Sequence, residues 1–417
     1  MKTKLLILFV IVFNSFAKAQ EMNCEEKEKQ LIQFLTDNEN KKALDLWDQV
    51  KLSCPSYSEN IYILGNRVLQ YQIEIADSKD KESKVNALLQ LYNQYDKYFP
   101  NNKNGNFEKR AIALFTYKVG TPEVLYSYLN QAFEKEKETF SNSQALYAYF
   151  EMYFAKYKEN QSTTSLETLL DKYCAVSSLV TSNSRKFPFK KEEYQRVSLG
   201  LDLLMQNILN KENIVPYAQK KLESNTTDTS WLEATAKVLS VQCKNSPVFE
   251  SVATKLNNVN PTSISAYYLA TYYLNTGSQD KAIEFYKKSA ELATDLMEKA
   301  TTYYSIATIL SDSDKATAEK MVLNALENNP SNGRYYIFLG NLYANSVNEC
   351  GTNSNERKAI YKLASNTVLK ATSVEPRLKP TADAMSAEYL KKAAVFDSES
   401  KVKSAKIGCW IQQTIQF

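Results

Sequence analysis

The sequence has 417 residues, with 51 Lys and Arg against 47 Asp and Glu and no histidine. The lack of an imidazole excludes serine and cysteine triads that use histidine, histidine general bases, and zinc or haem held by histidine. Only nine glycines occur, and neither GxxxxGK[ST] nor GxGxxG is present, which disfavours phosphate-cradling loops.

The first 19 residues have the pattern of a cleaved signal peptide. A basic start (residues 1–4) precedes an apolar run (5–13) and an Ala-Lys-Ala sequence (17–19), which is the order of parts in such a peptide. The apolar run is too short to span a bilayer, and a buried N-terminal helix is the alternative. Cys24 is not placed as a lipoprotein signal requires. We therefore expect an exported protein, periplasmic or extracellular, that does not span the membrane after cleavage.

Cleavage after Ala19 removes Lys2, Lys4 and Lys18, so the net charge falls from +4 to 4 − 3 = +1. A chain so close to neutral, without a stripe dense in Lys and Arg, lacks the electrostatic footprint of a nucleic-acid binder. We expect no nucleic-acid partner.

Apolar residues recur at helical spacing through the N-terminal part, residues 20–185, which we interpret as degenerate helical repeats. Leu31 and Leu35, then Ala43, Trp47 and Val50, show this spacing. Further helices are expected at 107–117, 122–137, 143–157, 165–180 and 192–210, with a long turn at 77–84 and breaks at 181–185 and 224–229. Residues 186–260 are interpreted as a helical bridging region.

Three successive repeats follow within residues 261–380. The first has Leu269, Ala270 and Tyr273 on one helix and Ala282 and Tyr286 on the next. Equivalent sets recur in the other two repeats: Tyr303, Ile306, Ala307, Ala318, Val322, Ala325 and Pro330, then Tyr336, Leu339, Gly340, Tyr343, Ala364, Val368, Ala371 and Pro376, with an insertion at 345–357. Small residues let two helices approach closely, and large ones fill the groove between neighbouring pairs.

This pattern resembles the tetratricopeptide repeat (TPR) family. The resemblance implies an all-α, TPR-like helical-hairpin solenoid of one or two lobes. Other landmarks look like those of exported TPR proteins of the Gram-negative envelope, namely Cys24, Trp47, Cys54-Pro55, Asn60-Ile61-Tyr62, Gly65, Cys243, Asn348-Glu349-Cys350-Gly351 and residues 407–411. That group is described mostly as repeat proteins, so it supports fold and compartment more than function.

In TPR proteins the first helix of each repeat lines a concave groove. Carried over by position, the resemblance implies candidate binding residues at Tyr267, Thr271 and Asn275, at Tyr304, Thr308 and Asp312, and at Ile337, Asn341 and Asn345. This lining lacks the Lys, Asn and Arg set that clamps a C-terminal carboxylate in chaperone-associated TPR proteins. Exposure to solvent without any ligand is the alternative.

All six cysteines lie beyond the signal segment, which favours disulfides in an oxidising compartment, with buried free thiols as the alternative. Cys24 and Cys54 flank two helices that form a hairpin, so its ends meet; closing that loop would stabilise the first repeat by roughly 3 kcal/mol. Cys350 in the insertion is the expected partner of Cys409. The pair Cys174–Cys243 then follows by elimination.

The C-terminal region, residues 381–417, is expected to hold a helix (380–394) and then a short strand or extended strap against the last repeat. Ile407, Cys409 and Ile411 would share one side of it. A surface-secretion signal is the alternative reading of this tail.

No catalytic, cofactor-binding or metal-binding residue is predicted. The acidic clusters Glu25-Glu26, Glu192-Glu193 and Asp312-Ser313-Asp314 are interpreted as solvated helix ends or turns. The sequence favours an exported, non-catalytic scaffold that binds a protein or peptide. A glycan- or nutrient-binding envelope protein is the alternative, against which Trp47, Trp231 and Trp410 are scattered rather than clustered.

Overall fold

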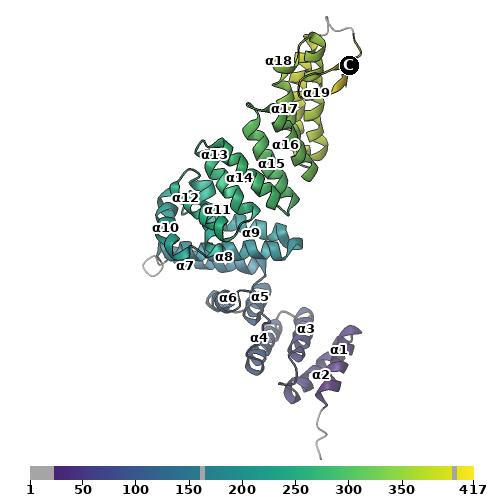
Figure 1. Ribbon diagram of the computed structural model, residues 1–417. Helices are drawn as coiled ribbons and strands as arrows, with labels where there is room; N and C mark the ends of the chain where they lie inside the picture. Colours follow the sequence, from purple (N-terminus) through teal and green to yellow (C-terminus); the bar gives the residue numbers. More distant parts are fainter. Residues whose placement is uncertain (1–22, 160–164, 397–401) are drawn as a thin grey trace, which may run out of the picture. The chain divides into compact units, whose positions relative to one another are not determined.

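The computed structural model describes residues 23–159, 165–396 and 402–417. The described chain is built of α-helices, with one short two-stranded sheet near its C-terminal end (Figure 1). Its internal contacts divide it into two compact units. Unit 1 comprises the described residues of Met1–Lys156 with Asn183–Val197, and unit 2 comprises those of Tyr157–Ser182 with Ser198–Phe417.

Unit 1 is a series of helix pairs in which each helix packs on the next from α1 to α6. The helices are α1 (Cys24–Thr36), α2 (Asn40–Ser53), α3 (Asn60–Ile75), α4 (Lys81–Tyr98), α5 (Asn106–Tyr117) and α6 (Pro122–Lys135). The start of α7 (Ser143–Glu159), the end of α8 (Leu166–Lys186), the 3-10 helix η1 (Pro188–Lys190) and the start of α9 (Lys191–Leu204) complete the unit.

In the core of the first hairpins, Trp47 of α2 packs against Gly65 of α3. Trp47 of α2 is buried, and a Cβ on Gly65 of α3 would lie 2.2 Å from its Nε1 atom. The indole Nε1–H donates to the carbonyl of Ile61 at 3.3 Å. The missing side chain at position 65 therefore lets α2 and α3 approach closely enough to bury the indole.

Unit 2 continues the same hairpin arrangement. It holds the end of α7, α8 up to Ser182 and α9 from Ser198. Its further helices are α10 (Lys211–Lys221), η2 (Leu222–Asn225), α11 (Thr229–Gln242), α12 (Pro247–Val259), α13 (Ser263–Asn275), α14 (Gln279–Leu292), α15 (Leu296–Leu310), α16 (Lys315–Asn328), α17 (Gly333–Ala344), α18 (Val347–Cys350), α19 (Ser354–Val374), η3 (Pro376–Leu378) and α20 (Lys379–Ala394). Consecutive helices pack on one another from α10 to α17, and α19 packs on both α17 and α20. The prediction of an all-α array of helical hairpins is confirmed.

Small residues mark the close contacts that the three repeats predict. Ala270, Ala282, Ala307 and Ala325 are buried without measurable exposure. At Gly340 of α17, a Cβ would meet Val368 of α19 at 2.4 Å. The repeat pattern thus corresponds to α13–α14, α15–α16 and α17–α19, and the insertion holds the short helix α18.

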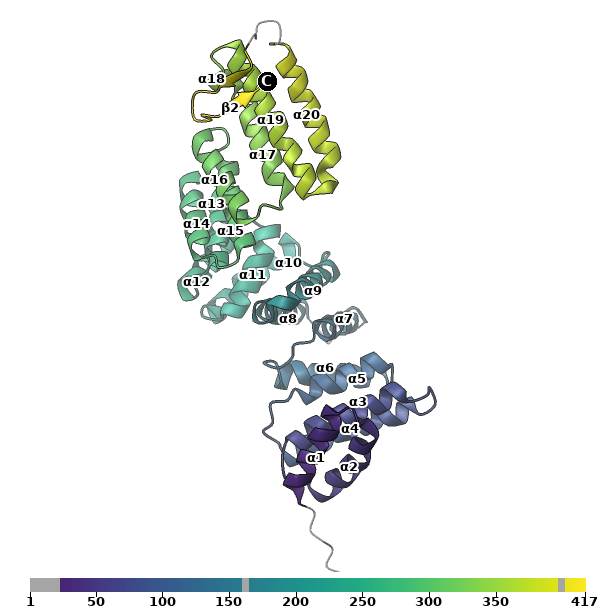
Figure 2. The ribbon, with the colours of Figure 1, turned by 90° about the vertical axis from the view of Figure 1, so that its right-hand side faces the viewer.

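The C-terminal strap, residues 402–417, folds into a hairpin. Strands β1 (Ser404–Lys406) and β2 (Thr414–Gln416) pair antiparallel, and both contact α19 (Figure 2). Ile407 and Ile411 are buried between them and the helices, and the Trp410 ring stacks on Tyr343 of α17. The expected strap against the last repeat is confirmed, and it covers the end of the array.

Two disulfides follow the predicted pairing, and the third predicted pair is wrong. Cys24 and Cys54 are bonded with Cα atoms 5.8 Å apart, and Cys350 and Cys409 with Cα atoms 5.2 Å apart. Cys174 and Cys243 are free and buried. The Cys174 sulfur lies 3.8 Å from the Thr235 hydroxyl, eight residues before Cys243, which is a distance of about 12 Å along an α-helix.

Several helix boundaries differ from those predicted, most clearly in α8 and α9. Helix α8 runs through residues 181–185, where polar residues predict a break, because their side chains find backbone partners. The Thr181 hydroxyl donates to the Ser177 carbonyl, and the buried Asn183 amide donates to the Phe140 carbonyl at 2.8 Å. Helix α9 ends at Leu204, six residues before the predicted end.

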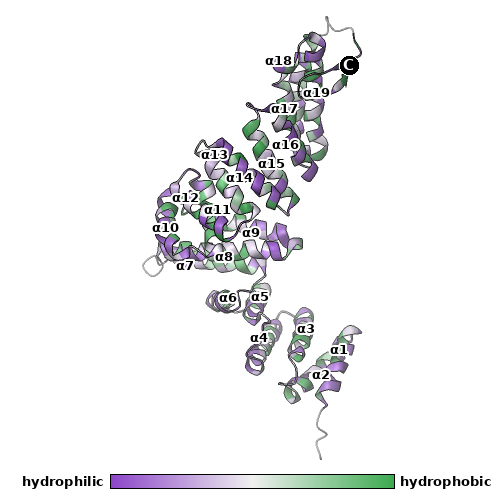
Figure 3. Cartoon of the chain, viewed as in Figure 1, coloured by the Kyte–Doolittle hydropathy of each residue, from purple (hydrophilic) through white to green (hydrophobic). Residues whose placement is uncertain are grey.

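The predicted signal peptide lies outside the described residues. Among the helices that the structure describes, none has the length and apolar character needed to cross a bilayer. Hydrophobic and hydrophilic residues are instead mixed within the same helices, as expected where one face of a helix is buried and another is in water (Figure 3).

Candidate functional site

Seven of the nine predicted groove residues lie on α13, α15 and α17 at steps of four residues, while Asp312 lies in the turn after α15 and Asn345 is the residue that follows α17. Residues four apart share a face of an α-helix, so each set of three forms one stripe. None of the nine is buried: Asn275, Thr308, Asp312 and Asn345 are exposed, and Tyr267, Thr271, Tyr304, Ile337 and Asn341 are half-buried. The stripes are therefore accessible, which binding requires.

Several polar groups in these stripes are bonded to their own helix. The Thr271 and Thr308 hydroxyls each donate to a carbonyl four residues earlier, at 2.9 Å. The Asn275 amide donates to the Thr271 carbonyl at 2.7 Å. The single hydroxyl donors of the two threonines are thus in use, as is one of the two amide N–H groups of Asn275, so the threonines offer a partner mainly their oxygen lone pairs.

The two tyrosines are fixed by neighbouring rings. The Tyr267 ring meets Tyr286 of α14 edge-on, with centroids 5.2 Å apart. The Tyr304 ring lies 4.8 Å from Tyr335 and 5.3 Å from Phe338, both on α17. Burial raises the pKa of Tyr304 above its ordinary value, so its hydroxyl stays neutral. Both rings therefore pack against neighbouring helices while part of each stays accessible.

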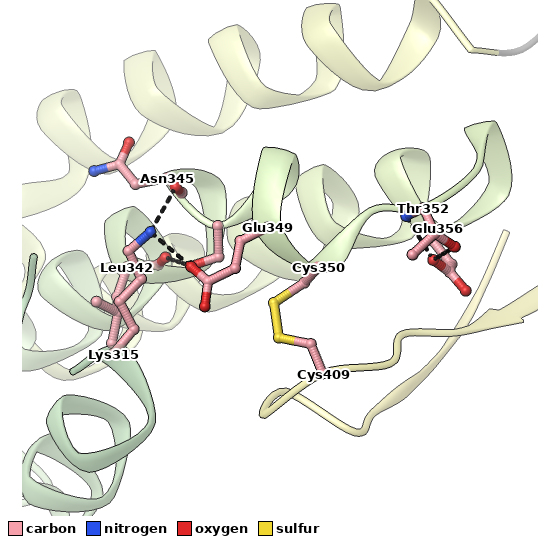
Figure 4. Close-up of a disulfide and its surroundings, with 9 residues drawn as sticks. Lys315, Leu342, Asn345, Glu349, Cys350, Thr352, Glu356 and Cys409 are labelled. Carbon is pink, nitrogen blue, oxygen red and sulfur yellow. Dashed lines mark hydrogen bonds and ion pairs between the residues drawn. A yellow bond between two sulfur atoms is a disulfide. The ribbon is translucent and has the colours of Figure 1, made fainter. Parts of the chain in front are cut away.

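The last stripe is partly engaged by other helices. Asn341 accepts a hydrogen bond from the hydroxyl of Tyr389 on α20. The backbone carbonyl of Asn345 accepts one from Lys315 of α16 at 3.1 Å, and Lys315 also pairs with Glu349 at 3.0 Å (Figure 4). Asn341 is therefore a structural contact as much as a surface residue.

Glu349 also belongs to the densest group of potential ligands in the described chain. Its carboxylate and the sulfur atoms of Cys350 and Cys409 lie within 4.8 Å of one another. The two sulfurs are bonded to each other, and Lys315 neutralises the carboxylate. This cluster ties α16, α18 and the C-terminal strap together (Figure 4) and is not suited to hold a metal.

A cleft that sequence analysis missed lies within unit 1. It has a volume of about 660 Å³. Its walls come from α5, the start of α7, and η1 with α9, with Phe115, Asn142, Ser143, Gln144, Tyr147, Ala148, Glu151, Lys190, Glu193, Arg196 and Val197 as lining residues. The volume falls in the range typical of ligand sites.

Hydrogen bonds between distant segments fix the shape of this cleft. The Ser143 hydroxyl donates to Glu193 at 3.2 Å, and the Tyr194 hydroxyl donates to the Ser141 carbonyl. The carboxylate of Glu108 accepts the backbone N–H groups of Ser141, at 2.9 Å, and Asn142. Burial raises the pKa of Glu108, and these two backbone bonds oppose that rise. The α6–α7 connection and α9 are thus held in place from both sides.

A small apolar niche adjoins the cleft. It has a volume of about 30 Å³ and is lined mainly by α5, α6 and α7 side chains, including Ile112, Leu129 and Ala145. Phe115, Asn142, Gln144 and Ala148 line both spaces. The polar cleft therefore opens onto an apolar end that admits only a small group.

The free thiols are not poised for chemistry. Burial raises the pKa of Cys174 to about 11, despite hydrogen bonds from Tyr217 and Thr235 that favour the thiolate. Burial also raises the pKa of Cys243. Both groups stay protonated near neutral pH, whereas a nucleophilic cysteine needs a lowered pKa.

Comparison with known proteins gives structural likeness without sequence relatives. No family model matches the chain, and no curated protein matches it. The P58(IPK) TPR domain is 12% identical over 91% of this chain and 99% of that one, with a TM-score of 0.29. The yeast Tom70 structure is 14% identical over 91% of this chain and 77% of that one, with a TM-score of 0.30.

Proposed function

We propose that the protein is an exported, non-catalytic scaffold that binds a protein or peptide partner. The observation that carries the proposal is the accessibility of the residue stripes on α13, α15 and α17, whose opposite faces are buried in the array. Stacked helix pairs present extended surface of this kind without needing an enclosed active site.

Export is supported by the N-terminal segment and by the two disulfides. Bonds such as Cys24–Cys54 and Cys350–Cys409 form and persist in oxidising compartments and are rare in the cytosol. The basic, apolar and small-residue order of residues 1–19 supplies the export signal. The location is the bacterial periplasm or the cell surface.

The pKa values of the free thiols and the buried tyrosines support a non-catalytic role for these residues. Burial raises the pKa of the Cys174 and Cys243 thiols, and of tyrosines such as Tyr194 and Tyr286, both to about 12. These shifts remove nucleophiles and bases from the working range instead of tuning them into it.

The positions of the three tryptophans do not support the glycan-binding alternative. Trp47 and Trp231 are buried, and Trp410 is half-buried against Tyr343. A row of rings on an exposed face, which sugar stacking would use, is not supplied by these three residues.

The test is chemical crosslinking in intact cells that export the protein, followed by affinity capture and mass spectrometry. A double variant, Asn275→Arg with Thr308→Arg, places bulk and charge on exposed positions of two stripes at little cost to stability. The matched control is Gln279→Arg with Leu323→Arg, on the exposed faces of α14 and α16.

We expect a protein partner with the native chain and the control, and its loss with the stripe variant. Capture that survives the stripe variant would remove the stripes as the binding surface. Capture of no protein by the native chain would contradict the scaffold function itself.

A further inference from the structure

We propose that the cleft of unit 1 binds an extended peptide segment in which a side-chain carboxylate adjoins a small aliphatic residue. The inference rests on the proposed function and names a partner chemistry for a site outside the predicted stripes. Two independent observations carry it, the charges of the cleft and the size of its niche.

The charged groups of the cleft are unequally satisfied. The carboxylates of Glu193 and Glu151 each accept a hydrogen bond from a hydroxyl group that lines the cleft. Ser143 donates to Glu193 at 3.2 Å, and Tyr147 donates to Glu151. In contrast, Lys190 and Arg196 form no ion pair in the described part of the chain, and the Lys190 ammonium has only the Phe189 ring, 6.0 Å away. The two cations of the cleft therefore lack a carboxylate partner among the described residues, and a bound anion would supply one.

The same carboxylates define what kind of anion fits. Glu151 and Glu193 share the lining with the two cations, so a dianionic phosphate would be repelled as well as attracted. A single carboxylate is matched to a planar guanidinium such as that of Arg196, which offers paired donors. The cleft thus favours a carboxylate over a phosphate group.

The niche limits the size of the ligand side chain that lies next to the carboxylate. Its volume of about 30 Å³ takes a methyl or slightly larger group and excludes a ring. Because Ala148 and Phe115 line both spaces, the niche adjoins the cleft, and we place the small side chain of the ligand there. An alanine, valine or threonine side chain satisfies this limit.

The size of the cleft favours a peptide segment over a ligand of a single residue. Its volume of about 660 Å³ is far larger than one carboxylate with one small side chain needs. Gln144 is exposed and lines both the niche and the cleft, and its amide can exchange hydrogen bonds with peptide groups. A peptide backbone crossing this space would use them.

The experiment selects binders of the full-length protein from a displayed library of random nine-residue peptides. We expect the enriched peptides to share an Asp or Glu next to Ala, Val or Thr. Synthetic peptides are then measured by fluorescence anisotropy, with the acidic residue replaced by Gln, by Lys or by phosphoserine, and the small residue replaced by Trp. Each replacement is expected to weaken binding at least about tenfold.

Protein variants complete the test. Arg196→Glu should weaken the acidic peptide about tenfold or more and should recover affinity for the Lys-substituted peptide, which a structural defect would not do. Ala148→Leu should fill the niche and remove the preference for a small residue. Lys41→Glu, an exposed charge reversal on α2, is the matched control and should leave affinity unchanged.

Several results would overturn the inference. These are the enrichment of no peptide, enrichment without a carboxylate, binding of sugars from a glycan array in place of peptides, or equal affinities of Arg196→Glu and Lys41→Glu. If a cellular partner is captured by the native protein and retained by Arg196→Glu, the inference fails while the scaffold function stands. If no protein is captured either, both fail.

Discussion

The indole of Trp47 occupies the space that a side chain at Gly65 would need, with Nε1 only 2.2 Å from the position of a Cβ atom. Substituting Gly65→Ala should therefore push the indole aside or separate α2 from α3. Overpacking of this kind lowers the free energy of unfolding by about 1–3 kcal/mol. The measurement is urea denaturation followed by circular dichroism.

Gly408→Ala is the matched control, because a Cβ there meets nothing within 4 Å and the backbone is not in the left-handed region. It should change the free energy of unfolding by no more than about 0.5 kcal/mol. If both substitutions change the free energy of unfolding equally, the contact between the indole and position 65 does not explain the requirement for glycine there.

The bond between Cys24 and Cys54 closes a loop across the first hairpin, with a sequence separation of 30 residues. Replacing both cysteines with alanine should lower the stability of this region by about 3 kcal/mol, because the unfolded chain regains loop entropy. Hydrogen–deuterium exchange would locate the effect in α1, α2 and α3. Unchanged exchange in these helices would contradict a stabilising role, and exchange in α17 and α19 is the internal reference.

The native protein should contain two free thiols and two disulfides. Alkylation after unfolding without a reductant should modify Cys174 and Cys243 alone, and digestion should give linked peptides that contain residues 24 with 54 and 350 with 409. In the folded state both thiols should label slowly because they are buried. If mass spectrometry finds no free thiol, Cys174 and Cys243 form a third disulfide and the prediction is wrong.

The stability contributed by Glu108 should depend on pH in a direction opposite to that of a paired surface carboxylate. Burial raises its pKa above the ordinary value of 4.5 in the folded protein, so the folded state holds this proton more tightly. The contribution is fully present below pH 4.5 and is lost as the pH rises through the folded-state pKa.

Glu108→Gln removes this titration and keeps an oxygen that accepts backbone N–H groups. Its free energy of unfolding relative to the native protein should rise as the pH increases above 4.5. Other titrating groups contribute equally to both proteins, so their effect on the pH dependence cancels in the comparison. Glu167, whose pKa is lowered by Lys220 and Lys221, is one of them. Parallel pH profiles of the two proteins would contradict the prediction, and Glu26→Gln on the surface of α1 serves as control.

The sequence carried most information where structure repeats. The recurring Leu, Ala and Tyr positions after residue 261 predicted α13 to α17 and α19, since each repeat must bury the same face against its neighbours, whereas α18 lies in the insertion and was not predicted. The bonds Cys24–Cys54 and Cys350–Cys409 were predictable because a hairpin or an insertion brings each pair together. Elimination failed for Cys174, because nothing in a sequence requires a buried thiol to be oxidised.

The cleft of unit 1 could not be predicted, because its parts have no periodic relation. Ser143 and Glu193 are 50 residues apart, and Asn183 reaches Phe140 across 43. The polar residues at 181–185 were interpreted as a break, although their side chains find carbonyl partners on α8 and beyond. Only the fold shows that these segments meet.

The two disulfides lie at opposite ends of the described chain, one on the first hairpin and one on the C-terminal strap. Arrays of stacked helix pairs lose structure most easily from their termini, because a terminal pair has a neighbour on one side only. Here the first hairpin and the C-terminal strap of the described chain each carry a covalent link, which opposes fraying where it would ordinarily begin. Limited proteolysis of the native protein should therefore cut first between interior helix pairs, and reduction should shift early cleavage toward α1–α2 and the strap.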